Sequence, residues 1–147
     1  MILFERFDAI VMKVTDGDTI TVTAGVHMFH IRLAHIDAPE DGQPFCLESK
    51  RALSALIYGK TVEVKPIGTD RYSRLVAEVK IEMVGDVSEF MIRNGYARWY
   101  DRKKRNEYYG FLEEEARKSK VGMWALNYQE TPWDFRKNKG GRIKNNR

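Results

Sequence analysis

The order of the expected strands and helices constrains the fold of this chain more than any other feature of its sequence. Three short runs rich in β-forming residues come first, separated by turn signals such as Asp16-Gly17. A stretch with helical spacing follows, then two more strands and two helices. The strands are expected at 9–14, 19–23, from residue 30 onward, at 62–64 and at 75–83, and the helices at 46–58, 89–93 and 107–120.

This order predicts a fold of the α+β class. Five short strands with a helix between the third and the fourth are the layout of a Greek-key β-barrel, the OB-fold, which commonly binds oligonucleotides. The sequence therefore predicts a five-stranded barrel with three α-helices. The 147 residues show no internal repeat, and they are enough to bury a core without a disulfide or a structural metal.

Local signals set the limits of some of these elements. The clearest strand, 75–83, alternates apolar side chains with Glu78, Lys80 and Glu82. The strand before it is expected to stop at Pro66-Ile-Gly68. In the last helix two pairs of opposite charge lie four residues apart: Glu113 with Arg117, and Glu114 with Lys118.

The positive charge of the chain is concentrated at its C-terminal end. The formal net charge is +4, but residues 135–147 carry six basic residues and no acid, which leaves residues 1–134 with a net charge of −2. We therefore divide the chain into a domain at 1–134 and a basic tail at 135–147 that is expected to be disordered. Such a tail would attract a polyanion by counterion release, and a purely solubilising tail is the alternative.

No segment of the sequence is long and apolar enough to cross a membrane, and residues 1–7 lack the apolar core of an export signal. If Met1 is native, the chain is expected in the cytoplasm; if a leader was removed, it is expected to be secreted or periplasmic. Cys46 is the single cysteine, which excludes an intramolecular disulfide and a thiolate metal cluster. A monomer with no obligate protein partner is expected.

The strand that begins at His30 delivers an arginine and two acids to one turn. Arg32 lies on the strand, and Asp37 and Glu40 flank Pro39 just beyond it. Two acids of this kind could hold a hard divalent cation and orient a water, while the arginine forks onto phosphate oxygens. Ordinary turn residues beside a solvated arginine would give the same pattern, so this stretch alone does not decide between them.

Two other segments carry the same residue types. Asp16-Gly17 is a hairpin signal, which leaves Asp18 unexplained. If the alternation of the 75–83 strand extends back by one residue, Arg74 faces away from the buried side chains, as Arg32 does. Two arginines beside three carboxylates would clamp phosphate charge, whereas solvated surface arginines are the alternative.

Four motifs of the chain resemble those of the staphylococcal nuclease-like proteins, the thermonucleases. They are Asp16-Gly-Asp-Thr19, Arg32-Leu-Ala-His-Ile-Asp-Ala-Pro-Glu40, Asp70-Arg-Tyr-Ser-Arg74 and Asn94-Gly-Tyr-Ala97, in the order and approximate spacing of the family. The resemblance spans roughly residues 9–124. It implies a calcium-dependent nuclease on an OB-fold, with magnesium as a possible substitute. Such a nuclease would hydrolyse DNA and RNA, prefer single strands and leave 3′-phosphate ends.

The resemblance also implies a cation site and a base. Asp18 and Asp37 would be the calcium carboxylates, the backbone carbonyl of Ala38 would add an oxygen, and Glu40 would be the general base or water-orienting group. Calcium takes about six to eight oxygens, so this set leaves room for waters and a phosphate oxygen. Two departures are visible: Ala38 replaces the family's frequent threonine, and the 41–45 loop looks shorter than in the secreted archetype.

The remaining roles concern the nucleic acid. The resemblance implies that Arg32 and Arg74 hold the scissile phosphate and stabilise its transition state, and that Tyr72, beside Arg71, helps to bind the nucleotide. Residues 98–105 contain five bases and one acid beside two aromatic residues, a mixture that suits a single strand. The members expected to bind nucleic acid are Arg98, Arg102, Lys103 and Lys104. In the alternative interpretation Trp99 covers the barrel and these cations are solvated.

A non-catalytic module that binds nucleic acid or protein on the same barrel is the alternative function. Degenerate relatives of that kind are expected to lose some of the acids and arginines. This sequence keeps all five positions, namely Asp18, Arg32, Asp37, Glu40 and Arg74. Catalysis is therefore the preferred interpretation.

Overall fold

The computed structural model describes residues 5–101 and 106–145, with side chains as far as residue 139. Its barrel consists of β1 (Phe7–Asp16), β2 (Thr19–Ala24), β3 (His27–Leu33), β5 (Thr61–Thr69) and β6 (Leu75–Ile81). The strands pair in the order β3-β2-β1-β5-β6, and a parallel pairing of β6 with β3 closes the barrel. The predicted α+β class and the five-stranded OB-like barrel are thereby confirmed. Of the short strands, β7 (Gly85–Asp86) pairs with β6, and β4 (Ile36–Asp37) pairs with β8 (Arg98–Trp99).

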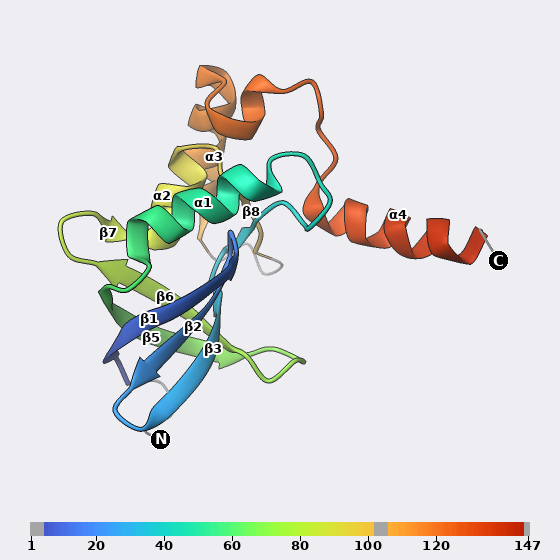
Figure 1. Ribbon diagram of the computed structural model, residues 1–147. Coiled ribbons are helices and arrows are strands. Elements are labelled where there is room, and N and C mark those ends of the chain that lie inside the picture. Colours follow the sequence, from blue (N-terminus) through green and yellow to red (C-terminus); the bar gives the residue numbers. More distant parts are fainter. Residues whose placement is uncertain (1–4, 102–105, 146–147) are drawn as a thin grey trace.

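Within residues 5–101 and 106–145, four α-helices and one 3₁₀-helix accompany the barrel. They are α1 (Cys46–Ile57), α2 (Val87–Arg93), α3 (Glu107–Ser119), η2 (Gly122–Ala125) and α4 (Pro132–Asn145). The first three α-helices gather at one end of the barrel, whereas α4 projects away from the rest of the molecule (Figure 1). The sequence predicts three α-helices, and α4 is the additional one. In the part of the chain that the structure describes, no helix has the length and apolar character that a membrane crossing requires.

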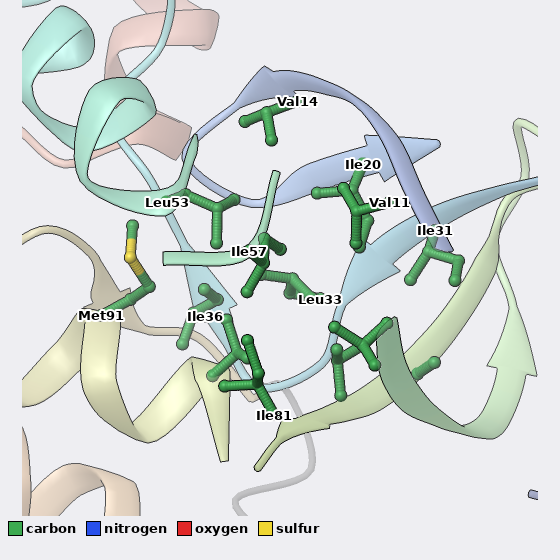
Figure 2. Packing of buried hydrophobic residues seen from close by; sticks show 14 of the residues in the cluster. Val11, Val14, Ile20, Ile31, Leu33, Ile36, Leu53, Ile57, Ile81 and Met91 are labelled. Carbon is green, nitrogen blue, oxygen red and sulfur yellow. The ribbon is translucent and has the colours of Figure 1, made fainter. Parts of the chain in front are cut away.

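The core lies where the inner faces of the strands meet α1 and α2. Alternate residues of the strands point inward, and the side chains of Val11, Ile20 and Ile31 are completely buried (Figure 2). Leu53 of α1 and Met91 of α2 close the end of the barrel and are also completely buried. Each such side chain contributes about 1.5–3 kcal/mol by leaving water. This continuous core fixes the strands from which the polar side chains described below project.

Two sequence predictions about single elements are wrong in detail. Strand β5 does not stop at Pro66 but continues to Thr69, because a register shift against β6 between Pro66 and Gly68 accommodates the proline. In α3 the predicted pair of Glu113 with Arg117 forms at 3.0 Å, but Lys118 lies 3.9 Å from Glu115 instead of pairing with Glu114.

The segment expected to be a disordered tail contains helix α4 instead. Its start has clear local causes: the hydroxyl of Thr131 accepts a hydrogen bond from the amide of Asp134 at 3.1 Å, and Pro132 occupies the first helical position. The ring of Trp133 lies 5.1 Å from that of Tyr100, which fixes the first turn against the body of the protein. Charge composition alone did not reveal these signals.

Candidate active site

The sequence-predicted residues converge on one cavity of about 710 Å³. Its lining includes Asp18, Arg32, Asp37, Glu40, Arg71, Tyr72 and Arg74. These residues come from the β1–β2 turn, from β3, from the segment after it and from the loop before β6. The barrel therefore brings together side chains that lie more than fifty residues apart in the sequence, from Asp18 to Arg74.

Asp18 is held by the way the β1–β2 turn docks onto the segment after β3. One of its carboxylate oxygens accepts a hydrogen bond from the backbone amide of Ala38 at 2.7 Å, and the other accepts one from the hydroxyl of Thr19 at 2.9 Å. Gly17 makes this approach possible, since a Cβ atom there would lie 1.9 Å from the hydroxyl oxygen of Ser49 in α1. The hairpin and the helix thus fix the position of the carboxylate.

Arg32 joins two buried carboxylates. Its Nη2 atom lies 3.4 Å from Asp18 Oδ2 and 3.2 Å from Asp37 Oδ1, while its Nη1 atom donates to the carbonyl of Leu33 at 3.1 Å. Burial on its own would raise the pKa of Asp18, but the Arg32 guanidinium and three hydrogen bonds together hold that pKa below its usual value. Burial raises the pKa of Asp37 despite its contacts with arginine.

Asp16 is a member of the cavity lining that sequence reasoning missed. Its carboxylate accepts a hydrogen bond from the amide of Asp18 at 3.0 Å. Burial, followed by the neighbouring negative charge of Asp18, raises the pKa of Asp16 to about 7. In the sequence, the Asp-Gly turn signal accounts for Asp16 without a functional role. The sequence does not show that its side chain is partly buried.

Arg74 is positioned by the loop before β6. Its Nε atom donates to Asp70 at 2.7 Å, and Asp70 also accepts hydrogen bonds from the amides of Tyr72 and Arg74. The Nη1 atom of Arg74 reaches the hydroxyl of Thr19 at 3.4 Å. The exposed ring of Tyr72 lies 5.3 Å from the Arg74 guanidinium and 5.0 Å from that of Arg71. An arginine and an aromatic face are therefore presented together at the cavity.

Glu40 contacts a residue that no sequence motif indicated. Its Oε1 atom lies 2.5 Å from Nη1 of Arg136 in α4, and Nη2 of Arg136 lies 2.8 Å from Asp37 Oδ2. The backbone of Glu40 is fixed by Gln43, whose side-chain oxygen accepts from the Glu40 amide at 2.9 Å. Arg136 is one of six bases in residues 135–147, and nothing in its sequence neighbourhood sets it apart from the others.

Of the nucleic-acid contacts predicted in residues 98–105, the structure describes only Arg98. Arg98 does not line the cavity: it is 6% exposed, donates to the carbonyl of Gln129 at 3.0 Å and lies 4.6 Å from the ring of Trp124. Its side chain packs against the body of the protein and does not face solvent. Trp99 packs against α3, where a Cβ at Gly110 would lie 2.7 Å from the indole ring, which agrees with the covering interpretation. The other three, Arg102, Lys103 and Lys104, lie outside the described residues.

The donor set of the cavity fits a hard divalent cation. Asp18 and Asp37 both lie within reach of one arginine nitrogen, so oxygens of the two carboxylates lie close enough together to ligate one cation. Among the described residues, no group of three or more acidic, histidine or cysteine side chains converges as a metal cage. A cation would therefore need backbone, water or substrate oxygens besides the carboxylates, as Ca²⁺ and Mg²⁺ commonly do.

Comparison with known proteins relates this cavity to a family. The family of staphylococcal nuclease homologues matches residues 30–126. An Escherichia coli O157:H7 protein named as an uncharacterized endonuclease is 36% identical over 129 residues, 88% of this chain and 84% of that protein. A Haemophilus influenzae protein of the same name is 37% identical over 128 residues, with 86% and 71% covered. The micrococcal nuclease of Shigella flexneri is 30% identical over 138 residues, with 86% and 79% covered.

Proposed function

Because this chain belongs to the family of staphylococcal nuclease homologues, we propose that it is a calcium-dependent endonuclease. It would hydrolyse phosphodiester bonds of DNA and RNA, prefer single strands and leave 3′-phosphate ends. The observation that carries the proposal is that one cavity is lined by two groups of residues. The arginines are Arg32 and Arg74, and the acids are Asp18, Asp37 and Glu40. A polyanionic substrate that is attacked by water needs both the positive charge and the acids.

The carboxylates on the barrel side of the cavity would hold the cation. Asp18 and Asp37 supply oxygens, and the backbone carbonyl of Ala38 is proposed as a further ligand. A bound calcium ion would neutralise charge on the phosphate and help to orient the attacking water. The Arg32 guanidinium, which now bridges the two carboxylates, is close enough to fork onto a phosphate that binds beside them.

Glu40 and Arg74 would both act on the reacting atoms, each with a different role. Glu40 would take a proton from water as the water oxygen bonds to phosphorus, and the bond to the 5′ oxygen would break with a solvent proton passing to that oxygen. Arg74, aimed by Asp70, would stabilise the charge that develops on the phosphate. Its neighbour Tyr72 offers an exposed ring for a nucleotide, and an unpaired strand can use such a ring more readily than a duplex.

One assay tests this proposal. The purified protein is incubated with single-stranded DNA, double-stranded DNA and RNA, each in calcium, magnesium or chelator, and the ends of the products are identified. We expect calcium-dependent cutting, fastest on single strands, with phosphate at the 3′ end. Equal binding of single-stranded DNA in calcium and in chelator, with no cutting, would instead support a non-catalytic binding module.

A further inference from the structure

The first turn of α4 reaches into the cavity with one side chain. The Arg136 guanidinium lies 2.8 Å from Asp37 Oδ2, 3.3 Å from Asp37 Oδ1 and 2.5 Å from Glu40 Oε1. A single cationic group therefore spans a proposed cation ligand and the proposed general base. Asp37 is completely buried, while the side chain of Arg136 is 41% exposed and approaches from the open side.

Contacts that precede Arg136 in the sequence keep α4 in this place. Trp133 stacks near Tyr100, which lines the cavity, and the ring of Phe135 lies 3.8 Å from where a Cβ of Gly42 would be. Before the helix, the carbonyl of Glu130 accepts a hydrogen bond from the side chain of Gln43 at 2.7 Å. Gln43 also fixes the backbone of Glu40, so one residue links the base of α4 to the proposed catalytic loop.

A guanidinium and a divalent cation need the same oxygens of this site. Both carboxylate oxygens of Asp37 are engaged by Arg136, and Oδ1 also lies 3.2 Å from Arg32, so a divalent cation at this buried side chain has to displace a guanidinium. Arg136 also engages one oxygen of Glu40, Oε1, and an oxygen bonded to a guanidinium is a poor acceptor for a water proton. The contact that neutralises the site in this conformation also prevents the chemistry proposed for it.

We propose that Arg136 is a tethered occupant of the cation site, and that α4 keeps the site closed until a divalent cation replaces the guanidinium on Asp37 and releases Glu40. The proposal rests on the proposed function, since it takes Asp37 as a cation ligand and Glu40 as the base. It extends that function to the C-terminal helix, which lies beyond residues 30–126 of the family match.

Competition of this kind weakens cation binding by a calculable factor. The apparent dissociation constant equals the intrinsic one divided by the fraction of molecules in which the site is open. If Arg136 is bound about nine-tenths of the time, its removal tightens calcium binding about tenfold. The effect appears without any substrate, which separates it from a role of Arg136 in holding nucleic acid.

The test is calcium binding by calorimetry on the full chain, without nucleic acid. Four proteins are compared: wild type, Arg136→Ala, Arg136→Gln and Lys137→Ala. Lys137 is an exposed base of the same helix that does not line the cavity, so it controls for the loss of one positive charge. We expect both Arg136 variants to bind calcium about tenfold more tightly than wild type, and Lys137→Ala to bind within about twofold of it.

Three results would overturn the proposal: unchanged or weaker calcium binding by the Arg136 variants, an equal gain in Lys137→Ala, or no calcium binding by any of the proteins. Nuclease assays on the same preparations separate this inference from the proposed function. If wild type cuts but the affinities are equal, the inference fails and the function stands. If affinity rises but no protein cuts, the competition stands and the proposed function fails.

Discussion

The two sides of the cavity are built differently. On the barrel side, the side chains of Asp18 and Asp37 are 8% and 1% exposed, and a backbone amide or a neighbouring strand fixes each one. On the other side, Arg136 is 41% exposed and reaches the cavity from a helix that projects away from the molecule (Figure 1). The first side belongs to the fold, while the second is attached to it by a few side-chain contacts.

This difference predicts which substitutions should alter the stability of the fold and which should alter only cation binding. Residues packed into the barrel cannot be altered without disturbing the core or its buried charges. A half-exposed guanidinium on a projecting helix can be removed at little cost to folding. Catalysis should depend on the barrel side, and access to the cation site should depend on α4.

The largest effect is expected from changes to the residues that would act on the substrate. Glu40→Gln and Arg74→Ala should each lower kcat by about 10²–10⁴-fold, because a proton acceptor or a transition-state charge is lost. The unfolding temperatures should stay close to that of wild type, since Glu40 is about one-third exposed and neither residue is in the core. Steady-state cutting of single-stranded DNA and thermal unfolding measure the two quantities.

Arg51→Ala is the matched control for these variants. Arg51 is an exposed arginine of α1 that does not line the cavity. It should leave kcat unchanged. If Glu40→Gln and Arg74→Ala cut as fast as this control, the catalytic role assigned to the barrel side is wrong.

A substitution at Gly17 should show how closely the β1–β2 turn packs against its neighbours. Gly17→Ala places a Cβ 1.9 Å from the Ser49 hydroxyl oxygen and 2.8 Å from the Ala38 side chain. Relief of this overlap should cost about 1–3 kcal/mol and lower the unfolding temperature by roughly 3–12 °C. Gly68→Ala is the control, because nothing lies within 4 Å of a Cβ there. Equal unfolding temperatures of the two variants would contradict this close fit.

The barrel side was largely accessible from the sequence, because alternation and turn signals report local structure. The apolar alternation of residues 75–83 predicted β6, and motifs on three separate segments predicted that Asp18, Arg32 and Arg74 would face one place. The pairing order of the strands followed from their number and from the helix placed between them. The effect of Pro66 was predicted wrongly. The sequence does not show that a register shift between β5 and β6 accommodates a residue without an amide hydrogen.

The α4 side of the cavity could not be predicted from the sequence, because its contacts are tertiary and its residues have no distinctive pattern. Arg136 resembles the other bases of a basic segment, and tertiary contacts such as the docking of Trp133 on Tyr100 place it over Asp37. The surroundings of Arg98 were also not accessible from the sequence. It stands in a basic run, but its guanidinium is buried against Trp124, which lies far along the chain.

Replacing Asp16, a partly buried acid on the barrel side, should show how its raised pKa affects stability. The pKa of Asp16 is raised to about 7 in the folded protein, against 3.8 for the unfolded chain, so the folded state binds more protons between these values. Stability is therefore lost as pH rises from about 4 to about 7. Asp16→Asn cannot ionise, and it should be more stable than wild type at pH 8 by on the order of 1–2 kcal/mol, but not at pH 4.

Urea unfolding in chelator at the two pH values measures this difference. Asp8→Asn is the control, because Asp8 is an exposed acid on the same strand and does not line the cavity. A gain in stability from Asp16→Asn that is the same at both pH values would show that burial of this carboxyl is not the cause.

The smallest effect is expected where α4 is attached to the body. Trp133→Ala removes the ring contact with Tyr100, at 5.1 Å between centroids, but leaves the barrel core untouched. The free energy of unfolding should change by less than about 1 kcal/mol, whereas α4 should leave the cavity more often. Calcium binding should then tighten by about two- to threefold, less than in Arg136→Ala, because the guanidinium is loosened but still present.

Phe111→Ala controls for the loss of an aromatic side chain, since Phe111 is an exposed residue of α3 that does not line the cavity. Calorimetry and urea unfolding on the same samples separate binding from stability. A large loss of stability in Trp133→Ala, with calcium affinity unchanged, would mean that α4 is part of the folded body and not an occupant that a cation can displace. The two sides of the cavity would then be one unit, and the exposure of Arg136 would reflect only its position at the surface.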